Sequence, residues 1–247
     1  MISMNDCFGI TDKGICRTSN QDSFAIEKKN DCLLGVVCDG IGGGQAGDVA
    51  SAMACEIMTE QFRQFFDPAQ DWQQWLLDTV TLVNISVYQK GLEDDECAGM
   101  GTTLVAFIAS DEKTVVINVG DSRCYQLTGG KMIQVSEDHT LVNELVKTQG
   151  FDYDFACSLV GRNVISRAIG VNEAVVGDCF ELENYQYLML CSDGLHGYVE
   201  EEAISSCLLD PQMSLEEKGS KLVALANEAG GWDNVTAVIL RGDEDGE

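Results

Sequence analysis

Four aspartates stand at the edges of apolar segments, each beside a glycine or another small polar residue. They are Asp39 in VVCDG, Asp121 in NVGDSR, Asp193 in LCSDG and Asp233 in GWDNV. One such carboxylate, taken alone, is usually a turn residue or a helix cap. Four that converge would make a dense anionic pocket. Hard divalent cations such as Mg²⁺ or Mn²⁺, which prefer oxygen ligands, would neutralise it.

The glycine segment after Asp39 offers a second chemistry. Residues 42–47, GGGQAG, match G-x-G-x-x-G between a predicted strand and a predicted helix, which is the context of dinucleotide binding. That helix leads into another helix rather than into a parallel strand, so no β-α-β unit is expected. We interpret the glycines as a segment whose backbone can approach an ion, so that a main-chain carbonyl can serve as a ligand.

Motifs of other phosphate and hydrolase chemistries are absent from the sequence. There is no G-x-x-x-x-G-K-[ST] loop and no G-x-S-x-G elbow. A cysteine-based phosphatase needs five residues between its cysteine and its arginine, whereas Cys157 and Arg162 are separated by four. The aspartates therefore remain the leading candidates for chemistry.

The elements that must position these aspartates come in blocks. Apolar runs and alternation predict strands at residues 33–38, 102–109, 114–119, 123–127, 132–135, 178–182, 187–191 and 235–240. Apolar residues at helical spacing predict helices at residues 45–66, from Trp72 to about Gly91, and at 139–149, 200–209 and 214–228. The short connection 67–71 predicts that the first two helices form an antiparallel pair. Residues 150–163 are expected to be irregular. This order favours an α+β protein with antiparallel sheets over a doubly wound parallel sheet.

The composition limits the partners. The 41 acidic and 15 basic residues give a formal charge of −26, which repels nucleic acid and anionic membrane surfaces and attracts cations. Most of these acids are expected to be solvated surface, and residues 242–247 an acidic tail. With 247 residues, 45% of them hydrophobic, residues 1–241 are expected to form one domain.

The cysteines and the N-terminus predict a reducing, cytoplasmic setting. Eleven cysteines occur without a C-x-x-C pair, and only two histidines accompany them, so a zinc site is not expected. Neither a signal peptide nor an apolar run of roughly 20 residues is visible. Cysteines in apolar segments, such as Cys38, Cys55, Cys191 and Cys207, are expected to act as small core residues.

The order of short motifs carries a resemblance. Each motif is weak alone, but eight occur in sequence: RTSNQD at 17–22, VCDGIGG at 37–43, GMGTT at 99–103, NVGDSR at 118–123, EDHT at 137–140, NVISRAIG at 163–170, CSDGL at 191–195 and DN at 233–234. In this order they resemble the 2C-type (PPM) metal-dependent serine/threonine protein phosphatases, most closely the compact bacterial branch. The resemblance runs from about Gly9 to Leu240.

The resemblance implies a fold and a set of site residues. The fold would be a four-layer α-β-β-α sandwich, with two antiparallel sheets flanked by helix pairs. Residues 150–163 would be the flap of bacterial members, which shapes substrate access. The resemblance implies a bridging carboxylate at Asp39, a carbonyl ligand at Gly40, further metal ligands at Asp193 and Asp233, an outer ligand at Asp22, a ligand of a third, weaker metal at Asp121, a phosphate-binding Arg17, and accessory roles for His139 and Asn234.

The resemblance also implies a reaction and partners. Two Mn²⁺ or Mg²⁺ ions, with a third in bacterial members, would hold a bridging hydroxide that attacks phosphoserine or phosphothreonine in proteins without a phospho-enzyme. The substrates would be products of a cognate Ser/Thr kinase, and the enzyme would act as a cytoplasmic monomer. His139 is open between a helix cap, a packing residue and a role in the chemistry, and His196 is expected to be structural.

Two positions depart from the family pattern. Many members carry a histidine where this chain has Ile41, although bacterial members usually have a hydrophobic residue there, and many carry Glu where it has Gln21. The general acid is therefore unassigned, and the second metal is expected to depend on Asp22 and water. These departures motivate a second hypothesis, a catalytically silent module that binds a phosphoprotein or a kinase. A third, an acidic cation-buffering protein, explains the charge but not the motif order.

Overall fold

Two antiparallel sheets form the centre of the protein. The computed structural model describes residues 2–41 and 46–242. The first sheet runs in the order β1 (Cys7–Asp12), β11 (Val235–Arg241), β10 (Tyr187–Cys191), β7 (Arg123–Thr128) and β8 (Lys131–Gln134). The second runs in the order β2 (Asp22–Lys29), β3 (Cys32–Ile41), β5 (Leu104–Ala109), β6 (Thr114–Val119) and β9 (Asp178–Leu182), with the short β4 (Gly101–Thr102) paired to β3.

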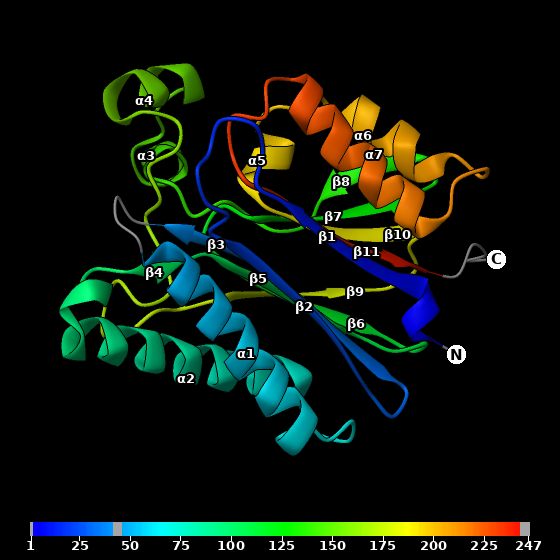
Figure 1. The fold of residues 1–247 in the computed structure, drawn as a ribbon, viewed down its shortest axis with the longest axis horizontal. Helices are drawn as coiled ribbons and strands as arrows, with labels where there is room; N and C mark the ends of the chain where they lie inside the picture. The colour runs from blue at the N-terminus through cyan, green and yellow to red at the C-terminus, as the bar shows by residue number, and fades with distance from the viewer. Residues whose placement is uncertain (1, 42–45, 243–247) are drawn as a thin grey trace.

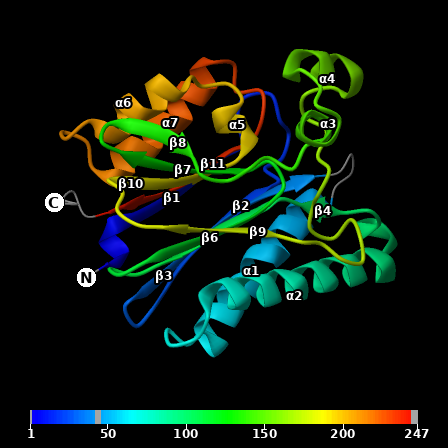
Figure 2. The ribbon, with the colours of Figure 1, turned by 180° about the vertical axis from the view of Figure 1, so that it is seen from behind.

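Helices cover the outer face of each sheet, which gives four layers (Figure 1). The long helices α1 (Gly47–Phe65) and α2 (Trp72–Glu93) pack on the second sheet, and α6 (Glu201–Leu209) and α7 (Leu215–Glu228) pack on the first. The expected α-β-β-α sandwich is confirmed. Beyond one end of the sheets stand α3 (Leu141–Gln149) and α4 (Tyr153–Val160), next to the four-residue helix α5 (Asp193–His196) (Figure 2).

Strand β3 shows why the sequence folds into these layers. Its residues alternate between two cores: Leu34 and Val36 pack under α1 and α2, whereas Leu33 and Val37 pack between the sheets. Because both faces of the strand are buried, its apolar run is continuous rather than alternating. The first charged residue after this run is Asp39, so the buried run places that carboxylate at the end of the sheet.

The helix ends follow local signals. The Asp71 side chain accepts hydrogen bonds from the backbone N–H groups of Gln73 and Gln74 and so caps α2. A capping box formed by Ser214 and Glu217 begins α7. The predicted helices at these positions are confirmed to within a few residues.

Several elements were not predicted from the sequence, among them the four-residue helix α5. Strands β1 and β2 were not expected, because their residues are mixed in polarity and mostly half-buried. The expectation that residues 150–163 are irregular was wrong, since α4 occupies Tyr153–Val160 and Asp152 caps it through the N–H groups of Asp154 and Phe155. This helix is only 8 residues long and a single one of its residues, Ala156, is buried, so its periodicity was too short to recognise.

The topology excludes the dinucleotide alternative. Strand β3, which precedes the glycine segment, pairs antiparallel with both β2 and β5, and α1 continues into α2. No β-α-β unit therefore forms there. The glycines at 42–44 and the acidic residues at 243–247 lie outside the described residues.

Two further expectations concern the cysteines and the membrane. The core positions expected for Cys38, Cys55, Cys191 and Cys207 are confirmed, since all four are buried. Each of the eleven cysteines is free of a disulfide, and all of them fall in the described ranges. Within those ranges, no helix has both the length and the apolar character needed to cross a membrane.

Candidate active site

The predicted aspartates converge at one end of the sandwich. Asp22 begins β2 and pairs in register with Asp39 near the end of β3. Asp121 lies in the turn between β6 and β7, Asp193 begins α5 directly after β10, and Asp233 precedes β11. Burial raises the pKa of Asp39 well above its usual value, and the charges of the other four aspartates raise it further. The structure therefore brings together all five carboxylates that the sequence singled out.

Burial and mutual repulsion disfavour the charged form of these groups. Burial raises the pKa of Asp22 to about 7, and Asp193 and Asp233 add to the effect. The pKa of Asp121 is also raised to about 7, by burial and then by Asp193. Burial raises the pKa of Asp193 to about 6, and the charge of Asp233 adds to the effect. An added positive charge at this end would therefore lower the free energy of the folded protein.

Hydroxyl groups from both sheets hold the two paired aspartates. Asp22 Oδ2 accepts hydrogen bonds from Ser192 Oγ and Thr236 Oγ1, both at 2.7 Å. The Asp39 N–H donates to Thr103 Oγ1 at 2.9 Å, and the Asp39 carbonyl accepts from Thr102 Oγ1 at 2.9 Å. Thr102 and Thr103, which fall in the motif GMGTT, therefore support the backbone of Asp39 from the neighbouring strand.

Gly40 is required by the close approach of three backbone segments. Its N–H donates to the Gln21 carbonyl at 3.1 Å. A Cβ atom at this position would lie 2.2 Å from the Gly47 carbonyl oxygen, and 2.7 Å from that of Gln21. No side chain fits there, so the absence of Cβ is what lets the start of α1 close over the end of β3.

Arg17 lies at the mouth of the site. Its Nη2 is 2.6 Å from Asp233 Oδ2, and about half of the arginine side chain is exposed to solvent. Asn234 holds the loop that carries it: Asn234 Nδ2 donates to the carbonyls of Lys13 and Ser19, and its Oδ1 accepts from the Gln21 N–H at 2.8 Å. Asn234, predicted as an accessory residue, thus positions the arginine loop.

Both histidines of the chain hold the turn that carries Asp121. His139 Nδ1 accepts a hydrogen bond from the Gly120 N–H at 3.1 Å, which leaves the proton on Nε2, 3.0 Å from Asp178 Oδ2. His196 Nε2 lies 3.0 Å from the Asp121 carbonyl and therefore donates to it. Burial lowers the pKa of His196 to about 4, so this ring is neutral near pH 7.

Neither histidine is free to serve as a proton donor to a substrate, since both nitrogens of His139 and the Nε2 of His196 are engaged. His196 has the structural place that the sequence predicted. His139 is not the helix cap considered for it, because the Thr140 side chain caps α3.

Sequence reasoning missed several supporting residues. Arg123 binds both carboxylate oxygens of Asp138 and donates to the Tyr125 hydroxyl at 2.7 Å. Asp138 in turn contributes to the raised pKa of Asp121. Arg123 and Asp138 fall inside the motifs NVGDSR and EDHT, so motif membership could have identified them. Ser192 likewise falls inside the motif CSDGL, whereas Thr236 follows no such signal, because small polar residues in and beside strands are common.

A cavity of about 240 Å³ opens above part of this cluster. Asp121 and Asp193 line it from the sheet side, Tyr153 and Arg162 from α4 and the segment after it, and Tyr198 from the loop after α5. The segment predicted as a flap thus contributes side chains to the wall of the site. This cavity can admit a side chain that reaches toward the carboxylates.

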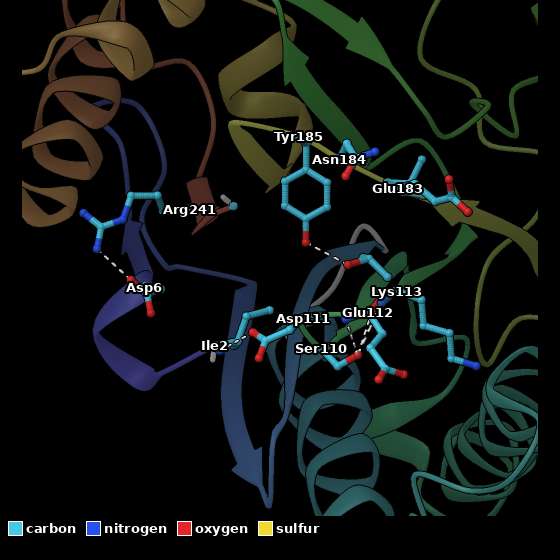
Figure 3. A pocket seen from close by; sticks show the side chains of 13 residues that line it. Ile2, Asp6, Ser110, Asp111, Glu112, Lys113, Glu183, Asn184, Tyr185 and Arg241 are labelled. Carbon is cyan, nitrogen blue, oxygen red and sulfur yellow. Dashed lines mark hydrogen bonds and ion pairs between the residues drawn. The ribbon is translucent and has the colours of Figure 1, made fainter. Parts of the chain in front are cut away.

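A larger cavity, of about 630 Å³, lies at the opposite end of the same strands (Figure 3). It contains none of the predicted site residues. Asp6 pairs there with Arg241 at 2.6 Å, and the Tyr185 hydroxyl is 2.7 Å from Thr114 Oγ1. One of its carboxylates is therefore paired with a basic side chain, as Asp233 is paired with Arg17 in the aspartate cluster.

The donor types at the aspartate cluster fit hard cations. Carboxylate oxygens from five aspartates, with the Gly40 carbonyl beside them, are the ligand chemistry that Mg²⁺ and Mn²⁺ prefer. Among the described residues, no three His, Cys, Asp or Glu side chains are already arranged as a complete metal site. Instead, Asp233 binds Arg17.

Comparisons with known proteins agree on one family. The family described as "Protein phosphatase 2C" matches residues 16–227. The serine/threonine phosphatase stp of Listeria monocytogenes is 35% identical over 238 residues, which cover 94% of each chain. Protein phosphatase PhpP of Streptococcus pneumoniae is 32% identical over 244 residues, or 96% of this chain and 98% of that one.

Solved structures give the same result. The serine/threonine phosphatase Stp1 of Staphylococcus aureus superposes with a TM-score of 0.89 at 33% identity, covering 98% of this chain and 96% of that one. The serine/threonine phosphatase PstP/Ppp of Mycobacterium tuberculosis superposes with a TM-score of 0.83 at 30% identity, covering 96% and 98%. Both similarities extend over almost the whole sandwich.

Proposed function

Because this chain belongs to the protein phosphatase 2C family and is a serine/threonine protein phosphatase, we propose that it removes phosphate from phosphoserine and phosphothreonine in proteins by a metal-dependent reaction in which water attacks phosphorus directly. The observation that carries the proposal is the convergence of five aspartates with Arg17 at one end of the sandwich. Residues 1–241 would act as one catalytic domain with a flap at 150–163, as a monomer, on the products of a cognate kinase in the cytoplasm.

The carboxylates divide into inner and outer positions. Asp39, Asp193, Asp233 and the Gly40 carbonyl would hold two Mn²⁺ or Mg²⁺ ions, with Asp22 behind them and Asp121 beside a third. When bound, such ions activate water and neutralise charge on the phosphoryl group. The raised pKa values of Asp22, Asp121 and Asp193 support this assignment, because a cluster that repels its own charge is one that favours bound cations.

Arg17 would bind the substrate phosphate. Guanidinium groups bind phosphate through two parallel hydrogen bonds, and Arg17 is exposed at the mouth of the cluster. Its present partner, Asp233, is one of the proposed ligands. If Asp233 serves as a metal ligand, its pairing with Arg17 would be weaker, and the guanidinium would be available to the phosphate oxygens.

The side chains around the site favour water over a protein nucleophile. The hydroxyls of Ser192 and Thr236 donate to Asp22, and that of Ser122 is hydrogen-bonded to Thr103. Both histidines are engaged with the Asp121 turn, so no histidine is paired with these hydroxyls, and all three hydroxyl side chains are fully buried. The bond from phosphorus to the water oxygen forms as the bond to the serine or threonine oxygen breaks. The attacking water gives up one proton to solvent, and the leaving oxygen takes one from solvent, since Ile41 has none to give.

The decisive experiment measures phosphate release from phosphoserine and phosphothreonine peptides. We expect turnover with Mn²⁺, loss of turnover in EDTA, recovery when Mn²⁺ is restored, and loss in Asp39→Asn. Full activity in EDTA would rule the proposal out.

Calorimetric titration with Mn²⁺ distinguishes this proposal from the second hypothesis, the catalytically silent binding module suggested by Gln21 and Ile41. That module predicts Mn²⁺ binding without turnover of any phosphopeptide.

A further inference from the structure

Three large apolar side chains stand exposed around the Arg17–Asp233 pair. Ile15 is 66% exposed, Tyr198 41% and Trp232 57%. Ile15 lies two residues before Arg17, and Trp232 directly precedes Asp233. Tyr198 follows α5 and lines the cavity that Asp193 also lines. Single exposed apolar side chains are ordinary, but three that gather around one ion pair form a patch of the kind that marks a binding surface.

The three loops that carry these side chains lie side by side. The N–H groups of Ile15 and Cys16 both donate to the Gly231 carbonyl at 2.9 Å, which ties the loop after β1 to the loop before β11. The charges of Asp193, Asp233 and Arg17 all act on the Tyr198 hydroxyl. Figures 1 and 2 both show the loop after β1, α5 and the loop before β11 next to one another.

The backbone before Trp232 is shaped to present its ring. Gly230 and Gly231 have φ angles of +127° and +57°, a region that glycine adopts without strain. A Cβ atom on Gly230 would lie 2.2 Å from Trp232 Nε1. One side of the indole therefore lies against bare backbone, while more than half of the side chain remains in solvent.

The position of this surface defines its occupant. A peptide advances by roughly 3.3 Å per residue, so the neighbours of a phosphorylated residue lie within about two such steps of its phosphate. If the phosphate binds Arg17, these neighbours lie within reach of the loops that carry Ile15 and Trp232. The formal charge of −26 opposes acidic neighbours and favours basic ones.

We propose that Ile15, Tyr198 and Trp232 form a peptide-binding surface that selects phosphoprotein segments with a large apolar side chain within two positions of the phosphorylated residue. The inference rests on the proposed function and adds its substrate class. Aromatic side chains supply large contact area at a small cost in conformational entropy, which suits Tyr198 and Trp232 to this task. Burying one Leu or Phe side chain accounts for roughly a tenfold preference or more.

Two phosphopeptides test the proposal. Both carry one phosphothreonine and the same net charge; one has Leu and Phe at the flanking positions, and the other has Ser and Gln. We expect kcat/KM of the native protein to favour the apolar peptide by about tenfold. In Trp232→Ala and in Tyr198→Ala this ratio should fall toward one, chiefly through KM. Phe65→Ala is the matched control, because Phe65 is 61% exposed at the end of α1 and should leave the ratio unchanged.

Three results would overturn the proposal: a ratio near one in the native protein, an unchanged ratio in Trp232→Ala, or a native dimer that sedimentation shows to be dissociated by Trp232→Ala. The last result would mean that the surface binds a second copy of the chain.

Fluorescence anisotropy of the same labelled peptides on the Asp39→Asn background reports the preference without turnover. A binding preference without hydrolysis by the native protein would reject the proposed function and keep this surface. Hydrolysis by the native protein without a preference between the two peptides would keep the proposed function and reject this surface.

Discussion

Two arginine–aspartate pairs, at opposite ends of the sandwich, have nearly the same geometry. Arg17 and Asp233 are 2.6 Å apart, with side-chain exposures of 51% and 22%. Arg241 and Asp6 are also 2.6 Å apart, with exposures of 49% and 23%. Their neighbours differ. Arg17 also faces Asp193 and Asp39, whereas Asp6 accepts further hydrogen bonds from Ser3.

The difference shows that the ion pair itself is not what distinguishes the functional end. Exposed pairs of this kind contribute about 0–1 kcal/mol each, so neither stabilises the fold much. At the Arg241 end the carboxylate is satisfied, and its pKa is lowered: burial alone would raise it, but hydrogen bonds from Ser3 and Arg241 prevail. At the Arg17 end, further carboxylates are buried with raised pKa values. Unsatisfied charge of this kind is typical of binding and catalytic sites.

The largest difference in activity between the two ends should come from replacing their carboxylates. Asp193→Asn is expected to reduce phosphopeptide hydrolysis by more than roughly 100-fold. Replacing a residue that only supports a metal ligand already lowers metal affinity or activity by about 10- to 100-fold. Asp6→Asn should leave kcat/KM within about twofold. Initial rates at saturating Mn²⁺ measure both. Equal losses in the two variants would show that the aspartate cluster has no special role.

The second contrast is between the arginines. Arg17→Ala is expected to lower kcat/KM by roughly 10- to 100-fold, since a hydrogen bond to a charged group is worth about 1.5–3 kcal/mol. Arg241→Ala, in the matched pair, should change it by less than about twofold. Competition by inorganic phosphate separates binding from chemistry: its inhibition constant should rise in Arg17→Ala only. An unchanged constant would remove Arg17 from the phosphate site.

Most of the fold was predictable because its cores are made of continuous apolar segments. The predicted strands at 114–119, 178–182 and 187–191 coincide with β6, β9 and β10. The failures, β1, β2 and α4, are elements whose side chains are mostly half-buried or exposed. Such segments fold through their neighbours, so their own sequence carries little periodicity.

The site was predictable to the extent that it depends on carboxylates at strand ends. Asp39 and Asp193 each end an apolar run, which is a local signal. The roles of His139 and His196 depend on which backbone groups lie opposite, and residues far apart in the sequence decide that. Gly120 and Asp121 meet these two rings only after the sheets have packed. No spacing within the sequence contains this information.

A smaller effect is expected from His196, which donates to the Asp121 carbonyl. His196→Leu should weaken Mn²⁺ binding by roughly tenfold at the weakest site, because residues that orient a ligand usually contribute this much. Titration calorimetry with Mn²⁺ should show the weak phase shifted and the tight phases retained. His196→Gln, which keeps a donor, should recover part of the affinity. Equal behaviour of the two variants would contradict a role for this hydrogen bond.

The smallest expected effect is on the free energy of unfolding. Its dependence on pH should have opposite signs for the carboxylates at the two ends of the sandwich. In EDTA, the folded-state pKa of Asp22 is raised from 3.8 to about 7, so the folded protein binds more protons than the unfolded chain between these values. The native protein therefore loses stability as pH rises through this range, whereas the amide of Asp22→Asn does not titrate. Urea denaturation should show the free energy of unfolding of the variant rising relative to that of the native protein as the pH increases from 5 to 8.

Asp6 should behave in the opposite way. Its pKa is lowered in the folded protein, so its charge contributes stability above the unfolded value of 3.8, and that contribution is lost as pH falls through the folded-state pKa. Asp6→Asn should therefore be less stable than the native protein at pH 8, with the deficit shrinking under acid conditions. Excess Mn²⁺ should remove the advantage of Asp22→Asn, because an ion that binds the folded state adds more stability to the protein with the intact cluster. Excess Mn²⁺ should leave the lower stability of Asp6→Asn unchanged, since Asp6 is already paired with Arg241. The same pH trend in both variants would mean that the two ends differ in geometry alone and not in unsatisfied charge.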